Sequence, residues 1–298
     1  MIRPLPTLPQ WERELLSDMI IVKTIKQIRQ AVAGQKKRGK RIGFVPTMGA
    51  LHEGHLSLIR LAKKHSDFVV VSIFVNPTQF GPKEDYKKYP RNLKKDAALC
   101  QTAGADLIFS PNVKEVYPEG FSTFINVEGL TQGLCGASRP GHFRGVATVV
   151  AKLFNIIQPE VAIFGQKDAQ QLAVIRRMVK ELDLPVKIIG APIVRERDGL
   201  AMSSRNAYLT LEERAEAPTL FRALQLAENM VKRGKREAES VKSDIVKLLR
   251  SDAPLAEIDY VEVVDNETLS PIKKISSRAL IAMAVKFPNA RLIDNVTV

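Results

Sequence analysis

Short apolar runs of strand length alternate with segments of helical periodicity along the first two thirds of the chain. The strand-like runs cover residues 42–45, 68–75, 106–109, 161–164 and 186–189. Between them, apolar positions three and four apart predict helices, as at Val146, Val149, Val150, Leu153 and Ile157, and again at Leu172, Ile175, Val179 and Leu182. This βα alternation predicts an α/β fold with a doubly wound parallel sheet.

The pattern changes after residue 193. Thr210 and Glu213 form a capping box that opens a short helix, and Pro218 can start the next helix. Apolar runs at residues 257–264, 278–285 and 292–298 then predict strands, in an antiparallel arrangement. We therefore expect a Rossmann-like domain over residues 1–192, with residues 1–20 as an N-terminal extension, and a smaller C-terminal α+β domain over residues 193–298.

Polar clusters follow several of the predicted strands of the first domain. They lie at residues 52–55, 76–79 and 165–168. In an open α/β sheet, ligands bind at the carboxyl ends of the strands. The sequence thus predicts one ligand site built from these clusters.

The first cluster contains His52 and His55, three residues apart, after a glycine-bearing turn and before a helix expected to start near Gly54. Such a junction exposes backbone N–H groups at the positive end of a helix, which suits a phosphate. Two interpretations compete with a phosphate site: zinc binding, which lacks a suitably spaced third ligand, and simple helix capping. A nucleotide site also requires a second phosphate-binding segment, and the run Met202-Ser203-Ser204-Arg205 supplies hydroxyls and a guanidinium. Taken alone, that run could be a solvated loop.

These segments and four others resemble the pantoate–β-alanine ligase (pantothenate synthetase) family. That family belongs to the nucleotidyltransferase superfamily, with its HxGH element and mobile KMSKS-type loop. The similarity covers roughly residues 20 to 298, and the motifs occur in the family's order: residues 46–55 (PTMGALHEGH), 74–80 (FVNPTQF), 89–91 (YPR), 139–146 (RPGHFRGV), 164–168 (FGQKD) and 202–206 (MSSRN).

The resemblance implies ATP-dependent condensation of (R)-pantoate with β-alanine through a pantoyl-adenylate, releasing pyrophosphate and AMP. It implies catalytic roles for His52, His55, Lys167 and Arg205, and a lid role for residues 202–205. The implied ATP-binding residues are Met48, Gly49, Ala50, Leu51, His52, Glu53, Gly54, His55, Gly165, Gln166, Lys167, Asp168, Val194, Met202, Ser203, Ser204 and Arg205.

The same resemblance implies a pantoate and β-alanine site at Asn76, Gln79, Arg139, His142 and Gln171. All of them except Gln79 have a structural alternative. Asn76 precedes a proline and could serve only a turn, and Arg139 and His142 lie in a Pro/Gly-rich loop. Gln171 could complete a capping box with Asp168.

Asp96 is the candidate magnesium ligand, although Lys94-Lys95-Asp96 offers one acid where the family often has two. The family also implies a homodimer.

The formal net charge of +13 could indicate a nucleic-acid partner. The basic residues are dispersed and no base-stacking aromatics interleave with them, so we expect a solvated basic surface that attracts anionic substrates. No apolar run approaches the ~20 residues of a membrane helix, and the start of the chain lacks a signal-peptide pattern. Cys100 and Cys135 form no CxxC motif. We expect a cytoplasmic enzyme with two reduced thiols and no membrane or nucleic-acid partner.

Two other functions remain open on sequence grounds. An adenylyltransferase that makes a dinucleotide would need a base-binding acceptor pocket in place of the Asn76 and Gln79 amides. A basic nucleic-acid-binding protein with a degenerate nucleotide fold would bind DNA or RNA tightly, with steep salt dependence.

Overall fold

The computed structural model describes residues 19–82 and 84–298. A six-stranded parallel sheet has the order β1-β4-β3-β2-β5-β6, and a three-stranded antiparallel sheet has the order β7-β8-β9. The large sheet contains β1 (Ile20–Val22), β2 (Ile42–Thr47), β3 (Phe68–Ile73), β4 (Leu107–Phe109), β5 (Val161–Gly165) and β6 (Lys187–Ala191). The small sheet contains β7 (Glu257–Asp265), β8 (Ala279–Lys286) and β9 (Arg291–Thr297). The predicted α/β class with a small antiparallel unit is confirmed.

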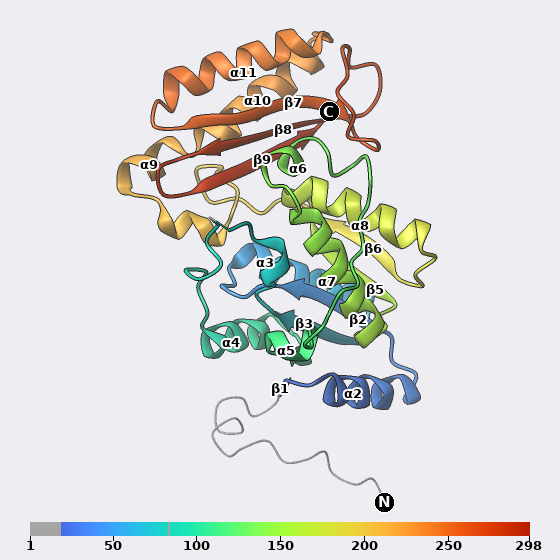
Figure 1. The fold of residues 1–298 in the computed structure, drawn as a ribbon. Helices are drawn as coiled ribbons and strands as arrows, with labels where there is room; N and C mark the ends of the chain where they lie inside the picture. The colour runs from blue at the N-terminus through green and yellow to red at the C-terminus, as the bar shows by residue number, and fades with distance from the viewer. Residues whose placement is uncertain (1–18, 83) are drawn as a thin grey trace, which may run out of the picture.

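Helices cover both faces of the large sheet (Figure 1). One face packs against α2 (Ile25–Lys37), α7 (His142–Ile157) and α8 (Ala169–Glu181), and the other against α3 (Glu53–His65) and α4 (Leu93–Ala103). The short helices α5 (Val113–Val116) and α6 (Cys135–Ser138) lie in the long connection before α7. Strand β2 is buried between these layers, which is why its sequence is apolar almost throughout.

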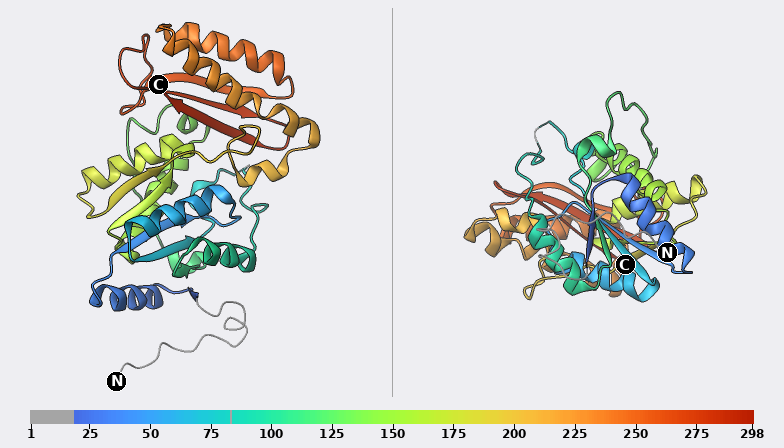
Figure 2. Two further views of the ribbon diagram at one scale, coloured as in Figure 1. Left: turned by 180° about the vertical axis from the view of Figure 1, so that it is seen from behind. Right: turned by 90° about the horizontal axis from the view of Figure 1, so that it is seen from below.

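The small sheet presents one face to helices of its own and the other to the first unit. Helices α10 (Thr219–Lys232) and α11 (Ala238–Asp252) pack on the first face, and α9 (Leu211–Glu216) precedes them. Leu280 and Ala282 on the opposite face join the same apolar cluster as α7 and α8. Figures 1 and 2 show this unit at the opposite end of the molecule from β1 and α2.

Most element bounds agree with the sequence patterns, and the exceptions have local causes. The run at 68–75 ends as a strand at Ile73, because Asn76 caps a 3-10 turn, η1 (Pro77–Gln79). Strand β1 was not predicted, since three residues carry no measurable period. The capping box at Thr210 and Glu213 is present, whereas Asp168 makes no side-chain bond to the start of α8. The capping alternative for Gln171 is therefore wrong.

The predicted domain division lies just after β6. The chain leaves the large sheet at Ala191 and forms an isolated antiparallel bridge between Arg195 and Ala201. The division between residues 192 and 193 stays a prediction, because it concerns independent folding. Residues 1–18 of the expected N-terminal extension lie outside the described residues. Over the described part of the chain, no helix combines the length and the apolar character needed to span a bilayer.

Candidate active site

A cleft opens where β2, β3 and β5 end, and the segment after β6 closes its other side. Most of the predicted site residues line it together. They are Met48, His52, Gly54, His55, Asn76, Gln79, Arg139, His142, Gly165, Lys167, Asp168, Gln171, Val194, Met202, Ser203, Ser204 and Arg205. The 3-10 turns η1, η2 (Gln166–Asp168) and η3 (Ser204–Tyr208) carry many of them, because each turn follows a strand or a bridge and redirects the chain into the cleft.

The two histidines at the start of α3 each use one ring nitrogen on the backbone. Nδ1 of His52 accepts from the Gly54 amide at 3.2 Å, and Nδ1 of His55 accepts from the His52 amide at 3.4 Å. A Cβ atom at position 54 would lie 2.9 Å from the His52 ring, so this close packing requires glycine. With Nδ1 as acceptor, each neutral ring carries its proton on Nε2.

Burial keeps both rings neutral. Desolvation, followed by the charge of Lys167, lowers the pKa of His52 to about 4. Desolvation, followed by the charges of His52 and Lys167, lowers the pKa of His55 to about 3. At neutral pH the pair therefore offers two uncharged Nε2–H donors, with ring centroids 4.2 Å apart.

The turn before α3 differs from the expected row of open backbone donors. The Gly49 amide donates to Thr47, and the amides of Ala50 and Leu51 donate to the Asp96 carboxylate at 3.0 and 2.8 Å. Asp96 is 2% exposed and both of its oxygens accept these bonds. Asp96 therefore holds the turn in place and does not line the cleft, so the structure does not support it as a magnesium ligand.

Five predicted ATP-binding residues do not line the cleft: Gly49, Ala50, Leu51, Glu53 and Gln166. Glu53 instead pairs with Arg60 on the exposed side of α3. The side chains facing the cleft, more than the turn's amides, thus supply its donors.

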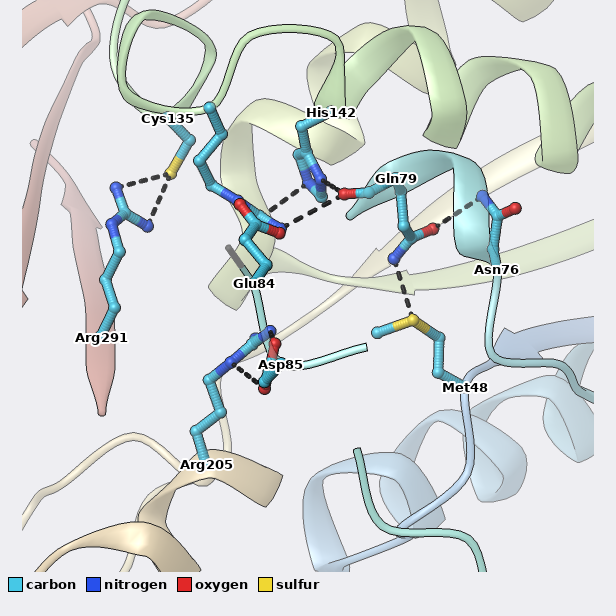
Figure 3. Close-up of polar contacts among 10 residues, drawn as sticks. Met48, Asn76, Gln79, Glu84, Asp85, Cys135, His142, Arg205 and Arg291 are labelled. Carbon is cyan, nitrogen blue, oxygen red and sulfur yellow. Dashed lines mark hydrogen bonds and ion pairs between the residues drawn. The ribbon is translucent and has the colours of Figure 1, made fainter. Parts of the chain in front are cut away.

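Asn76 and Gln79 form a buried amide pair. Nδ2 of Asn76 donates to Oε1 of Gln79 at 3.1 Å and to the Gly145 carbonyl at 3.2 Å. Nε2 of Gln79 donates to the Met48 sulfur at 2.9 Å (Figure 3). Asn76 also accepts from the Thr78 amide, so it serves the turn and the site at once.

Arg139 and His142 lie beside Gln79 and already have protein partners. Arg139 pairs with Glu84 through two nitrogens, at 2.7 and 2.6 Å. Its Nη1 contacts Nε2 of His142 at 3.1 Å, and Nδ1 of His142 contacts the Gln79 carbonyl at 2.7 Å. The structure thus brings both residues to the cleft but uses their polar atoms to hold neighbouring groups.

Residues 202–205 contact Asp85, which follows Glu84 in the connection between η1 and α4. Nε and Nη2 of Arg205 donate to Asp85 at 3.2 and 3.0 Å, as Figure 3 shows. The Ser204 hydroxyl lies 3.2 Å from the Tyr89 hydroxyl, and Ser203 accepts from the Arg205 amide. Two arginines of the cleft are therefore neutralised by Glu84 and Asp85.

Strand β9 fixes the η2 turn. Nδ2 of Asn295 donates to the carbonyls of Gln166 and Lys167 at 3.1 and 2.8 Å. This tie explains how Lys167 and Asp168 are held between the two units. Both residues and Gln171 also line a side chamber that continues toward Arg291.

The sequence reasoning missed two sets of residues. Apolar side chains also line the cleft, among them Phe74, Val146, Val149, Val150, Leu153 and Phe164. Their helical and strand periodicity marked them as core, and nothing in that period distinguishes a cleft wall from a core. The acids Glu84 and Asp85 follow a recognised motif by four and five residues and carried no signal of their own.

Magnesium has no protein cage in this cleft. No group of three or more His, Cys, Asp or Glu side chains is placed to hold a metal within residues 19–82 and 84–298. Asp168 is the acid among the residues that line the cleft. These residues do not fit a metal held mainly by protein carboxylates.

Both cysteines are free and buried. Desolvation, followed by the charge of Asp96, raises the pKa of Cys100 to about 12, so that thiol is unreactive. Cys135 lies 3.2 Å from the Tyr260 hydroxyl.

Comparisons with known proteins show the family of this chain. The model of the pantoate-beta-alanine ligase family matches residues 20–297. A pantothenate synthetase of Acetivibrio thermocellus is 54% identical over 280 residues, which cover 94% of this chain and 99% of that protein. One from Moorella thermoacetica is 56% identical, covering 93% and 98% of the two chains.

Solved structures give the same result. Pantothenate synthetase from Thermus thermophilus superposes with a TM-score of 0.89 at 50% identity, covering 93% of this chain and 99% of that one. A pantoate-beta-alanine ligase from Francisella tularensis has a TM-score of 0.78 at 36% identity, covering 93% and 97%. The resemblance inferred from the six motifs is confirmed, and the chain belongs to the pantoate–β-alanine ligase family.

Proposed function

We propose that this cleft condenses (R)-pantoate with β-alanine in two steps, at the expense of ATP. The main support for this proposal is that the neutral imidazoles of His52 and His55, with their Nε2–H donors, line the same cleft as the Asn76–Gln79 amide pair. The Francisella tularensis ligase, solved in complex with β,γ ATP and β-alanine, supports these two ligands.

In the first step, a carboxylate oxygen of pantoate attacks the α-phosphorus of ATP, and pyrophosphate leaves. Negative charge spreads over the phosphoryl oxygens in the transition state. His52 and His55 donate to these oxygens, and Lys167 and Arg205 offset the charge of the leaving pyrophosphate. Such prearranged donors each contribute ~3–4 kcal/mol to lowering a barrier.

In the second step, the amine of β-alanine attacks the acyl carbon of the adenylate. The carbon–oxygen bond to AMP breaks, the amide bond forms and the amine loses its proton. The adenylate already carries a good leaving group, so no protein nucleophile is needed. The work of the protein is to hold the reactants in line.

Pantoate fits between polar and apolar walls. In this proposal Gln79 and Gln171 bond its hydroxyl groups and carboxylate, and Asn76 fixes the Gln79 amide. The apolar wall of six side chains named above suits its two geminal methyl groups. Amide partners discriminate against acids that lack the hydroxyl, because the amides would be left unpaired.

ATP would lie along the opposite side, against Gly165, Lys167, Asp168 and Val194, with residues 202–205 over its phosphates. Met48 and Gly54 also line the cleft. We propose that Mg2+ enters bound to the phosphates of ATP, because the cleft has no carboxylate cage for it among the described residues.

We also propose a homodimeric, cytoplasmic enzyme with no nucleic-acid or membrane partner. The family supports the dimer, and the dispersed basic residues support a solvated surface. The first domain ends at residue 192 in this proposal, and residues 193–298 form a second domain that closes over ATP as a lid.

Pyrophosphate–ATP exchange tests the two-step scheme. Pantoate alone should support exchange of labelled pyrophosphate into ATP, because the adenylate forms before the amine attacks. Hydroxy acids without the two methyl groups should support much less exchange. Exchange that requires β-alanine would exclude a free adenylate intermediate.

A further inference from the structure

A series of polar contacts runs from Glu84 to the backbone carbonyl of Gln79, the residue expected to bind pantoate. The Glu84 carboxylate accepts from Nε and Nη2 of Arg139, at 2.7 and 2.6 Å. Nη1 of Arg139 lies 3.1 Å from Nε2 of His142, and Nδ1 of His142 lies 2.7 Å from the Gln79 carbonyl. Figure 3 labels Glu84 and His142 on one side of Gln79 and Asn76 on the other.

The partners decide which nitrogen of His142 carries the proton. A carbonyl oxygen only accepts, so Nδ1 must donate to Gln79. A guanidinium only donates, so Nε2 must be bare and accept from Arg139. His142 is therefore held as the neutral Nδ1–H tautomer, the opposite of His52 and His55.

The charge state of His142 agrees with this tautomer. Desolvation, followed by the charge of Arg139, lowers the pKa of His142 to about 4, against the raising effects of Gln79, Glu84 and Asp168. A protonated ring would place an Nε2–H group against the guanidinium. The arrangement is stable only while the ring is neutral.

Glu84 is the group that orients Arg139. The two side chains are 26% and 16% exposed, and both carboxylate oxygens are engaged. An isolated exposed ion pair contributes little to stability, but a two-pronged pair fixes the plane of the guanidinium. That plane determines whether Nη1 reaches His142.

We propose that Glu84 is a positioning residue for pantoate binding. It sets the plane of Arg139, and Arg139 and the Gln79 carbonyl together fix the tautomer of His142. Arg139 and His142 both donate to the Gln79 carbonyl, the former at 3.4 Å, and so hold the backbone that directs the Gln79 amide toward pantoate. Glu84 itself does not line the cleft. The inference rests on the proposed function only in assigning pantoate to Gln79.

Nitrogen-15 NMR of the imidazoles tests the first half without any substrate. The chain has four histidines, so each ring is assignable by substitution. In the unaltered protein, His142 should show a protonated Nδ1 and a bare Nε2. Glu84→Gln should change these shifts toward a mixture of tautomers, because one of the two oxygens that accept from Arg139 becomes an NH2 group that faces an N–H donor.

Asp85→Asn is the matched control. It removes the same charge from the neighbouring residue, whose partner is Arg205 and not Arg139. The His142 shifts should stay as they are. Equal spectral changes in both variants would attribute the effect to the loop as a whole and overturn the proposal.

Steady-state kinetics test the second half. Glu84→Gln should raise the Michaelis constant for pantoate about tenfold, which corresponds to ~1.4 kcal/mol. The constant for ATP should change less than about threefold. A change in tautomer without a change in pantoate dependence, or the reverse, would overturn the proposed connection.

Arg139→Lys gives an independent version of the same experiment. Lysine keeps the charge but cannot bridge Glu84 and His142 in one plane. It should reproduce both the change in the His142 shifts and the rise in the Michaelis constant for pantoate. The experiment can therefore be carried out even if Glu84→Gln folds poorly. Failure of pantoate-dependent exchange in the unaltered enzyme would reject the proposed function and leave the NMR result readable.

Discussion

Several polar side chains have a structural role and a chemical role at the same time. His52 caps α3 through Nδ1 and keeps Nε2–H for a ligand. Asn76 caps η1 through its oxygen and fixes Gln79 through its nitrogen. Sequence patterns present capping and binding as alternatives. In these residues they are compatible, because different atoms perform them.

Gln171, by contrast, has no capping role in the structure. Asp168 makes no side-chain cap to α8, so Gln171→Glu should leave the free energy of unfolding within about 0.5 kcal/mol, as for substitutions away from structural features. The new carboxylate should repel that of pantoate and raise the Michaelis constant for pantoate at least tenfold. Pantoate titrations and urea unfolding of the same samples measure both effects. Normal pantoate dependence would remove Gln171 from the site.

At the scale of elements, local patterns were sufficient for most of the fold. Strands β2, β3 and β5 have strong apolar runs, and α7 and α8 have clear helical spacing, so their order predicted the sheet and the edge that carries the site. The pairing of Asp96 with Ala50 and of Glu84 with Arg139 joins positions 46 and 55 residues apart. No local period encodes such contacts, so the sequence could not reveal them.

The turn between β2 and α3 depends on one of these distant contacts. Asp96→Asn keeps a single acceptor and turns an NH2 group toward a backbone N–H. Leaving a buried donor unsatisfied costs ~1–3 kcal/mol, so the free energy of unfolding in urea should fall by that amount. Exchange activity should also fall, because the turn places His52. The exposed Glu119→Gln, with the same charge change, should alter neither quantity.

The segment that begins the second unit should act mainly in the transition state. Arg205 is the cation of residues 202–205 and lines the cleft. Arg205→Ala should slow adenylation far more than it weakens ATP binding. Attack of β-alanine on supplied pantoyl-adenylate should change much less. Single-turnover rates of the two half-reactions decide the point, and an equal loss in both would exclude this role.

At the scale of the whole molecule, the cleft depends on contacts between the two sheets. Asn295 of β9 holds η2, and Leu280 and Ala282 of β8 pack into the same cluster as α7. Arg195, just after β6, pairs with the buried Asp294 at 2.6 Å. These contacts place the proposed catalytic side chains of one unit against residues 202–205 of the other.

The neutral histidines should make the protein sensitive to mild acid. His52, His55 and His142 have pKa values lowered from 6.5 to about 4, 3 and 4 in the folded state. As the pH falls from 6.5 toward 4, the unfolded chain binds protons that the folded protein excludes. Stability must therefore decrease over that range. Urea midpoints should be lower at about pH 5 than at about pH 7.

Two substitutions check the origin of that decrease. His55→Asn should reduce the difference between the two midpoints, because it removes one of the three groups. His65→Gln, at an exposed position at the end of α3, should leave the difference unchanged. If the difference between the two midpoints is the same in the unaltered protein and in both variants, the acid sensitivity belongs to other groups.

The Asn295 contact also bears on when the enzyme first becomes active during its synthesis. The large sheet is complete once residue 191 has been made, whereas the bond that holds η2 comes from the final described strand. Protein domains generally fold from the N-terminus as the ribosome delivers them. A nascent chain could thus form the first sheet and its histidine pair while η2 still lacked its anchor. Productive use of ATP would begin only after β9 had left the ribosome, which keeps an unfinished chain from consuming ATP.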